Sequence, residues 1–262
     1  MMEYLNQTPL KERLIFDSHA HYDDQRFDGI RDELLTSLTD NGVEYIVNCG
    51  CDKVSSQKAL EMAEKHGFVY AAVGIHPSNL DCGTTIDEIE TLAKHQKCVA
   101  IGEIGLDYYW TDDNKPLQRE VFCKQLELAK RLDLPVIIHD REAHSDTLEI
   151  LKEYKPKGVV HSFSGSVEMA EELLKIGLYI GVGGVITFKN AKKLPDVVKM
   201  LPEERLLLET DAPYLAPVPY RSKTNHSAMI YFSAQKIAEI RSTTPTNILK
   251  ITNKNAKMLF GI

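Results

Sequence analysis

The strongest constraint on the fold is a regular alternation of short apolar runs and amphipathic stretches along the 262 residues. The apolar runs are rich in Val, Ile and Leu, lack polar alternation, and end in polar residues or glycine, which is typical of parallel strands buried on both faces. Eight such runs occur, at residues 14–16, 43–48, 69–74, 99–102, 135–138, 158–160, 178–181 and 205–208.

Between these runs, apolar residues recur at helical spacing and predict helices over 30–38, 55–65, 86–94, 116–131, 144–152, 167–174 and 194–200. Two more helices are predicted over 227–240 and 247–260. Eight βα units in about 250 residues fit a closed (β/α)8 TIM barrel, so we predict one α/β domain over residues 1–262. An open doubly wound sheet is the competing fold. Its first strand would more often be followed by Gly-x-Gly-x-x-Gly, whereas here His19-Ala20-His21 follows.

Composition narrows the class of protein. The five cysteines form no Cys-x-x-Cys pair and several lie in apolar runs, which predicts reduced, buried thiols and a cytoplasmic protein. The first ten residues lack the apolar core of a signal peptide, and no run reaches the ~18 apolar residues of a spanning helix, so we expect no membrane association. The net charge of −7 argues against binding nucleic acid through a broad Lys/Arg surface. It does not exclude an enzyme that holds a few phosphates with metal ions.

Potential metal ligands stand at the ends of five predicted strands. In a (β/α)8 barrel the carboxyl ends of the strands converge on the face that carries the active site. Strand alternation points the imidazoles of His19 and His21 the same way. Each ligand alone could be a strand-end cap or a solvated carboxylate, but coincidence is a poor account of the full set, which comprises His19, His21, Glu103, His139, His161 and Asp211.

The donor set favours a catalytic metal centre. Imidazole and carboxylate suit Zn, Mn, Fe or, with more oxygen, Mg, and the absence of cysteine at these strand ends argues against a closed structural zinc site. Two divalent ions about 3.5–4 Å apart, bridged by a carboxylate, can generate hydroxide near neutral pH and stabilise attacking and leaving oxygens. Such a centre hydrolyses esters or amides.

The motifs at these strand ends resemble those of TatD-type metal-dependent deoxyribonucleases of the amidohydrolase superfamily. They match in order and span essentially the whole chain: Phe16-Asp17-Ser18-His19-Ala20-His21, Gly74-Ile75-His76-Pro77, Gly102-Glu103-Ile104-Gly105-Leu106-Asp107-Tyr108, His139, His161-Ser162-Phe163-Ser164-Gly165 and Glu209-Thr210-Asp211-Ala212-Pro213-Tyr214-Leu215.

The resemblance implies a role for each ligand. His19, His21 and Asp211 would hold one ion, and His139 and His161 would hold the other. Glu103 would bridge the two ions, where many superfamily relatives use a carbamylated lysine. Asp211 would also accept a proton from the attacking water.

The resemblance also implies substrate-binding residues. His76 would contact a substrate phosphate, although a turn histidine fixed by Pro77 is an equal alternative. Asp107 and Tyr108 would line the pocket with Tyr109, and the tyrosine rings would either stack on bases, worth roughly 1–3 kcal/mol per base, or only pack.

One segment departs from the family pattern. Members usually carry Arg-Gly-Lys-x-Asn-Glu-Pro after the last strand, and this chain has Arg221-Ser222-Lys223-Thr224-Asn225-His226-Ser227. Arg221 matches and is expected to bind substrate. Because glycine permits close backbone approach and proline fixes a turn, we expect the loop to lie differently here. The resemblance therefore carries less weight for the substrate than for the metal centre.

Three functions fit these residues. The first is a deoxyribonuclease that uses two divalent ions (Zn, Mg, Mn, Fe or Co) and trims single-stranded DNA ends as a 3'-5' exonuclease. The second is a small-molecule amidohydrolase or phosphoesterase on the same centre, favoured by the acidic charge and the altered Arg221 loop. The third is a non-catalytic, metal-stabilised binding module. The loss of one of the predicted metal ligands would favour this function, and none of them is missing from the sequence.

Overall fold

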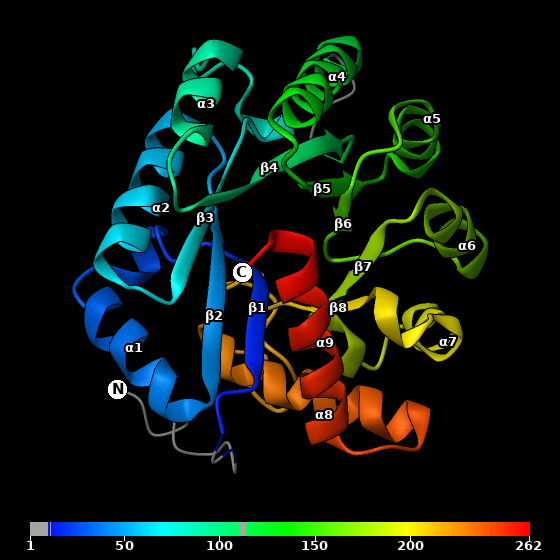
Figure 1. Cartoon of the computed structure of the whole chain (residues 1–262). Coiled ribbons are helices and arrows are strands. Elements are labelled where there is room, and N and C mark those ends of the chain that lie inside the picture. The colour runs from blue at the N-terminus through cyan, green and yellow to red at the C-terminus, as the bar shows by residue number, and fades with distance from the viewer. Residues whose placement is uncertain (1–9, 11, 110–113) are drawn as a thin grey trace.

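The computed structural model describes residues 10, 12–109 and 114–262. The segment 1–9, for which we expected no signal peptide, lies outside the described residues. In the described part of the chain, eight parallel strands form one sheet in sequence order, and the sheet closes into the predicted (β/α)8 barrel (Figure 1). The strands are β1 Ile15–Ala20, β2 Val43–Cys49, β3 Val69–Val73, β4 Cys98–Asp107, β5 Val136–Arg141, β6 Gly158–Val160, β7 Tyr179–Val182 and β8 Leu206–Leu208.

Helices surround the barrel on its outside (Figure 1). Their ends follow local signals: the Asp52 side chain caps the first turn of α2 in a capping box with Ser55, and α6 ends at Gly177 with a φ of 95°. The helices are α1 Arg31–Leu38, α2 Lys53–Lys65, α3 Ile86–Ala93, α4 Lys115–Leu132, α5 His144–Tyr154, α6 Val167–Ile176, α7 Leu194–Met200, α8 Ile230–Arg241 and α9 Pro245–Phe260. Among the described residues, no helix is both long and apolar enough to span a bilayer.

The seam between β1 and β8 is closed by hydrogen bonds near the carboxyl ends of the two strands. Ser18 Oγ donates to the carbonyl of Leu208 at 3.0 Å, and the Asp211 amide donates to the carbonyl of His19 at 2.9 Å. The His21 amide donates to the carbonyl of Ala212 at 2.7 Å. The first and last strands are therefore fastened at the position where predicted ligands stand.

A buried carboxylate reinforces this seam. Asp17 is fully buried and accepts hydrogen bonds from the Thr210 amide at 3.0 Å, from the Thr210 hydroxyl at 2.6 Å and from the Ser227 hydroxyl at 2.7 Å. Because an unpaired buried carboxylate would be costly, these donors are what permits Asp17 to lie there. The contacts join β1, the end of β8 and the loop that departs from the family pattern.

Three elements differ from the sequence expectations. β1 extends to Ala20 and β4 extends to Asp107, so His19 and Glu103 lie within strands rather than after them. The expected helix over 227–240 begins with a 3-10 turn, Ser227–Met229, before α8. The prediction that the cysteines are buried is confirmed for Cys49 and Cys98, whereas Cys51 and Cys123 are half-buried and Cys82 lies exposed in the loop before α3.

Candidate metal centre

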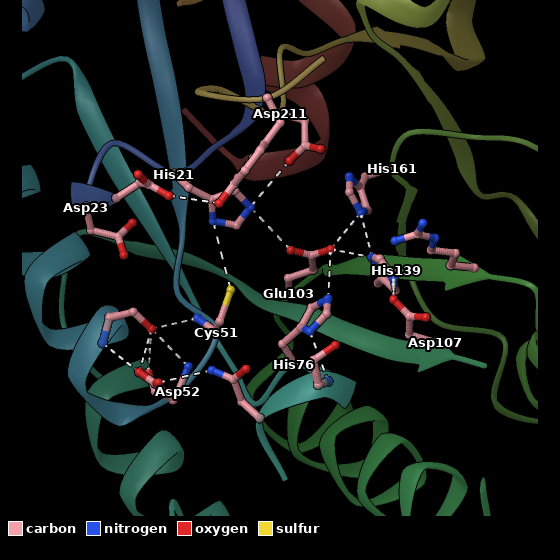
Figure 2. Close-up of a pocket in the computed structure, with 16 residues that line it drawn as sticks. His21, Asp23, Cys51, Asp52, His76, Glu103, Asp107, His139, His161 and Asp211 are labelled. Atoms are coloured by element: carbon pink, nitrogen blue, oxygen red, sulfur yellow. Dashed lines mark hydrogen bonds and ion pairs between the residues drawn. The ribbon is translucent and has the colours of Figure 1, made fainter. Parts of the chain in front are cut away.

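Side chains from the carboxyl ends of five strands gather around Glu103 on β4 (Figure 2). Its Oε1 atom lies 2.7 Å from Nδ1 of His139 and 2.7 Å from Nε2 of His161. Its Oε2 atom lies 3.4 Å from Nε2 of His19 and 3.4 Å from Nε2 of His21. One carboxylate thus faces two groups of imidazoles, which is the arrangement expected of a bridging ligand.

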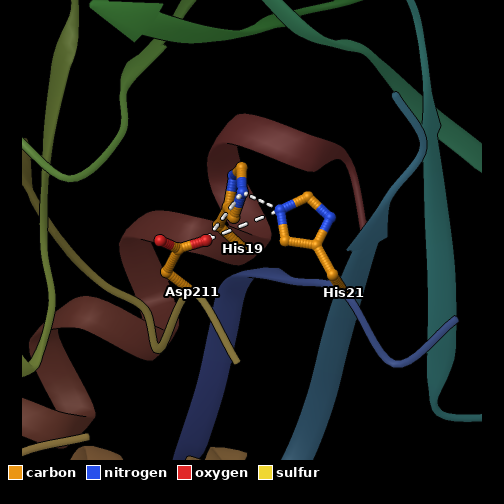
Figure 3. A group of neighbouring side chains, drawn as sticks. All are labelled: His19, His21 and Asp211. Carbon is orange, nitrogen blue, oxygen red and sulfur yellow. Dashed lines mark hydrogen bonds and ion pairs between the residues drawn. The ribbon is translucent and has the colours of Figure 1, made fainter. Parts of the chain in front are cut away.

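Asp211 completes the group formed by His19 and His21 (Figure 3). The two Nε2 atoms lie 2.9 Å apart, and Asp211 Oδ1 lies 3.7 Å from that of His19 and 3.5 Å from that of His21. His19 is fully buried, and the other two side chains are mostly buried. These three residues are the ones that the resemblance assigns to one ion.

The protonation pattern of this group fits a cation. Nδ1 of His21 lies 2.9 Å from the carbonyl oxygen of Cys49, which can only accept, so Nδ1 carries a proton and, in the neutral ring, Nε2 presents a lone pair. That lone pair faces Nε2 of His19 and the carboxylates of Asp211 and Glu103, an arrangement that is repulsive without a positive charge between them. Nitrogen and carboxylate oxygen suit Zn, Mn, Fe or Mg.

The carboxylates of the centre are held in the ionised form. Burial alone would raise the pKa of Glu103, but the imidazoles of His161 and His19 hold that pKa well below its usual range. Burial likewise opposes ionisation of Asp211, and its contact with His21 lowers the pKa of the carboxyl. Both groups therefore offer negative oxygens at neutral pH.

The ring nitrogens that face away from Glu103 have carboxylates as neighbours. Asp107 Oδ2 lies 3.0 Å from Nε2 of His139. Contact with Asp107 and Glu103 outweighs burial and raises the pKa of His139 to about 9. Glu209 lies 3.7 Å from Nδ1 of His161 and accepts a hydrogen bond from the Ser162 amide. A carboxylate within hydrogen-bond distance, as Asp107 is of His139, orients a metal-binding histidine and fixes its tautomer, whereas Nδ1 of His161 has no hydrogen-bond partner among the described residues.

His76 faces the same carboxylate from the loop after β3. Its Nδ1 accepts the Ser78 amide at 3.1 Å, and its Nε2 lies 3.6 Å from Glu103 Oε1. Because Nδ1 is an acceptor, neutral His76 carries its proton on Nε2 and presents a donor to the centre. A donor there suits a contact with a substrate oxygen.

Asp211 holds an unusual backbone conformation. Its φ is 57°, in the left-handed region that costs a non-glycine residue of order 1 kcal/mol. Its amide donates to the carbonyl of His19, and its carbonyl accepts from the amide of Tyr214 at 2.8 Å. The seam therefore stabilises the turn that aims this carboxylate at His19 and His21.

The centre lies in a cleft made of two neighbouring cavities, its lobes. We call the place where the two lobes meet, at the residues that line both of them, the waist. The two cavities have volumes of about 530 and 500 Å³. Both are lined by His139, Arg141, His161, Asp211 and Tyr214. We call the first the His76 lobe; its other lining residues include Asp23, Asp24, Asp52, His76 and Asp107. We call the second the His144 lobe; its other lining residues include Asp140, Glu142, His144, Ser162, Ser164 and Leu215.

Three expected substrate residues, Tyr108, Tyr109 and Arg221, do not line either lobe; Tyr109 is exposed, with the Arg141 guanidinium 3.8 Å from its ring centroid. The Tyr108 hydroxyl donates to Asp146 at 2.8 Å, outside the cleft. Arg221 is exposed and stacks on Phe188, with its guanidinium 3.5 Å from the ring centroid. His76 and Asp107 do line the His76 lobe, although Asp107 is only 3% exposed and is engaged with His139.

The loop that departs from the family pattern is anchored by two of its residues. The Asn225 amide group donates to the carbonyl of Thr210 at 2.9 Å and to that of Tyr214 at 2.7 Å. Ser227, which stands where relatives have proline, uses its backbone amide to donate to the Tyr22 hydroxyl at 2.8 Å. A proline would lack this donor, so serine supplies a different attachment at the same place.

Two residues near the centre were missed by the sequence reasoning. Glu209 was not predicted as a site residue. Its position two residues before Asp211, near the end of the last strand, is the signal that could have indicated it. Cys51 lines the His76 lobe, with its sulfur 4.0 Å from Nδ1 of His21. Cys51 follows β2, and no ligand was predicted at the end of that strand. Cysteine is therefore absent from the ends of the five strands that carry predicted ligands, but it is not absent from the surroundings of the centre.

Known proteins resemble this chain over almost its full length. The family model described as TatD related DNase matches residues 16–261. YabD of Bacillus subtilis, described as an uncharacterized metal-dependent hydrolase, is 44% identical over 254 residues, covering 95% of this chain and 100% of YabD. YcfH of Escherichia coli K12, described in the same words, is 34% identical, covering 95% of this chain and 96% of YcfH.

A solved structure shares the fold closely. The crystal structure of YjjV, a TatD homologue from Escherichia coli K12, superimposes with a TM-score of 0.88 at 33% sequence identity. The match covers 95% of this chain and 99% of YjjV.

Proposed function

Because the chain belongs to the TatD-related family of metal-dependent hydrolases, we propose that it is a deoxyribonuclease that removes nucleotides from single-stranded DNA ends. The observation that carries the proposal is the single carboxylate, Glu103, that lies in the His76 lobe and faces both groups of imidazoles. A waist with a lobe on either side suits a bond that joins two bulky groups, as a phosphodiester does.

The ligand set supports two divalent ions. His19, His21 and Asp211 would hold one, and His139 and His161 would hold the other, with Glu103 shared between them. When bound, such ions lower the pKa of water and stabilise the attacking and leaving oxygens. Zn or Fe suits the four imidazoles best, and Mg or Mn would draw mainly on the two carboxylates.

The protein's own residues supply the other parts of the reaction. Asp211, ionised and aimed into the waist, accepts the proton of the attacking water. His76 donates from Nε2 to a phosphate oxygen. Arg141 lines both lobes and brings a permanent positive charge to the phosphate. Asp107 keeps the His139 ring in place.

The test is a nuclease assay with matched variants. Metal-loaded protein is incubated with end-labelled single-stranded DNA, beside Glu103→Ala, His139→Ala and the control His95→Ala, which removes an exposed histidine that pairs with Glu64. We expect label release by wild type and His95→Ala, and a loss of at least 100-fold in the two site variants. Equal release by all four proteins would remove the proposal.

A small-molecule hydrolase on the same centre is the second candidate. The observation that favours it is the acidity of the His76 lobe, where Asp23, Asp24 and Asp52 add negative charge beyond the ligands. A panel of bis(p-nitrophenyl) phosphate, a lactone and a cyclic amide separates the two: turnover of the lactone or amide without release from DNA would favour this candidate. The third hypothesis, a non-catalytic module, has no support in a chain that belongs to a hydrolase family and has every expected ligand.

A further inference from the structure

Two loops at the carboxyl face of the barrel contain lysine and arginine residues but no acidic residue. Residues 183–195, after β7, contain Lys189, Lys192 and Lys193, and residues 212–227, after β8, contain Arg221 and Lys223. Neither segment contains Asp or Glu, in a chain whose net charge is −7. The positive charge is therefore concentrated locally.

The two loops pack against each other. The Val218 amide donates to the Thr187 hydroxyl at 2.8 Å, and the Arg221 guanidinium lies over the ring of Phe188. At Gly184 a Cβ atom would come within 2.2 Å of the Leu215 carbonyl oxygen, so the backbones are in direct contact. Their cations consequently share one surface.

This surface borders the His144 lobe. Tyr214 and Leu215, in the second loop, line that lobe directly. Lys193, in the first loop, is near enough to His144, another residue that lines this lobe, to act on it electrostatically. We call Lys189, Lys192, Lys193 and Arg221 the basic rim.

The lysines of the basic rim have no compensating carboxylate in contact. Lys189, Lys192 and Lys193 are exposed, and none forms an ion pair within the part of the chain that the structure describes. Lys53 and Lys65, by contrast, pair with Glu88 and Asp32. Uncompensated charge beside a cleft attracts an anionic partner.

The opposite side of the cleft has the reverse sign. Asp23 and Asp52 stand at the edge of the His76 lobe (Figure 2), and Asp24 lines it as well. A polyanion that continued past this side would meet three carboxylates. The His144 lobe also has acidic lining residues, Asp140, which pairs with His144, and Glu142, so the difference between the two sides of the cleft comes from the basic rim beside that lobe.

Tyr214 stands between the two ends. It is 41% exposed and lines both lobes, its hydroxyl donates to Asp24 at 2.8 Å, and Arg26 covers its ring 4.5 Å from the centroid. An exposed aromatic ring beside basic side chains is the usual combination for holding single-stranded nucleic acid.

We propose that the basic rim binds the sugar-phosphate backbone of single-stranded DNA. The DNA then extends from the metal centre across the His144 lobe and along the rim, and only the end of the strand reaches the His76 lobe. This rests on the proposed function and adds a direction to it. The acidic side then limits how far the strand advances, which is the behaviour of an enzyme that works from ends.

The test compares charge reversal on the rim with equal reversal elsewhere. Lys189→Glu/Lys192→Glu alters the rim, and Lys250→Glu/Lys254→Glu alters α9 to the same net charge. Lys254 stands between Asn253 and Asn255, which donate to the carbonyls of Leu14 and Leu206 near the opposite ends of the strands. Binding of a fluorescein-labelled phosphorothioate 20-mer of thymidine to the metal-loaded proteins is followed by anisotropy at several salt concentrations, beside turnover of bis(p-nitrophenyl) phosphate.

We expect the rim variant to bind the 20-mer at least tenfold more weakly than the α9 variant. Its log–log salt slope should be smaller by about 1.4, since each lost single-strand phosphate contact contributes about 0.7. Its turnover of the small diester should stay within twofold of wild type. Equal binding by the two variants, or equal loss of diester turnover and 20-mer binding in the rim variant, would overturn the proposal. Failure of the wild type to release nucleotides from DNA would instead remove the proposed function, since the binding measurement does not depend on cleavage.

Discussion

The carboxylate of Glu209 lies 3.7 Å from Nδ1 of His161, on the side of the ring away from Glu103. Glu209 is almost completely buried, and burial raises its pKa to about 8. The space for it exists because residue 181 is glycine: a Cβ atom there would lie 2.4 Å from Glu209 Oε2. The glycine at position 181 thus leaves room for a buried carboxyl group beside the imidazole of His161, at a distance longer than a hydrogen bond.

Glu209→Ala should weaken metal binding while leaving every predicted ligand in place. The His161 ring loses the carboxyl group nearest its Nδ1 atom, and we expect a loss of metal affinity in the range of 10–100-fold that is typical when a partner of a metal-binding histidine is removed. Gly181→Ala should do the same by displacing the carboxylate. Titration against a chelating dye measures both, with the exposed Glu239→Gln as control. Unchanged affinity in Glu209→Ala would show that packing alone holds His161.

Metal removal should lower the thermal stability markedly. At metal concentrations near 1,000 times Kd, binding contributes about 4 kcal/mol, which corresponds to roughly 10 °C in Tm for a domain of this size. Calorimetry with and without chelator measures the shift in wild type and in His19→Ala. The shift should largely disappear in His19→Ala and persist in His95→Ala. A shift of the same size in His19→Ala would contradict the assignment of this histidine.

Ser227→Ala should destabilise the fold through the buried contact with Asp17. The hydroxyl donates to Asp17 and also contacts the Tyr22 hydroxyl at 2.8 Å, so its loss leaves a buried carboxylate short of one donor. Urea denaturation should show a fall of about 1–3 kcal/mol in the free energy of unfolding. Ser222→Ala, in the exposed part of the same loop, should change it by less than about 0.5 kcal/mol.

His226 should make stability fall in mild acid. Burial lowers its pKa from 6.5 to about 4. The unfolded chain therefore binds a proton more readily between these values, and unfolding becomes more favourable as the pH falls below about 6.5. Between pH 8 and pH 5 the wild type should lose about 2 kcal/mol more than His226→Gln. Parallel urea curves at the two pH values measure this, and equal losses in the two proteins would count against a buried neutral imidazole.

The sequence was sufficient to predict the barrel because the βα period repeats along the chain and each strand is buried on both faces. It also predicted which ligands meet, since the carboxyl ends of barrel strands converge. His19 and His21 share a face by simple alternation, and Asp211 reaches them across the seam.

The side chains just beyond the ligands were harder to predict because their direction depends on where each strand ends. We expected the fourth strand to end at residue 102, whereas β4 continues to Asp107. Alternation along the longer strand puts Asp107 on the inner face with Glu103 and sends Tyr108 to the other side, toward Asp146. The direction of Arg221 depends on its stacking with Phe188, a contact between separate loops that no local pattern encodes.

The seam between β1 and β8 joins residues that are synthesised at very different times. Ser18 and Leu208, which form one of its bonds, are separated by 190 positions, and Asp211 follows them still later along the chain. During synthesis, His19 and His21 leave the ribosome long before the carboxylate that completes their group exists. A nascent or truncated chain that ends before Asp211 therefore holds only part of the ion's coordination shell, and complete coordination of the ion requires that the chain has been made through Asp211 and that the seam has closed.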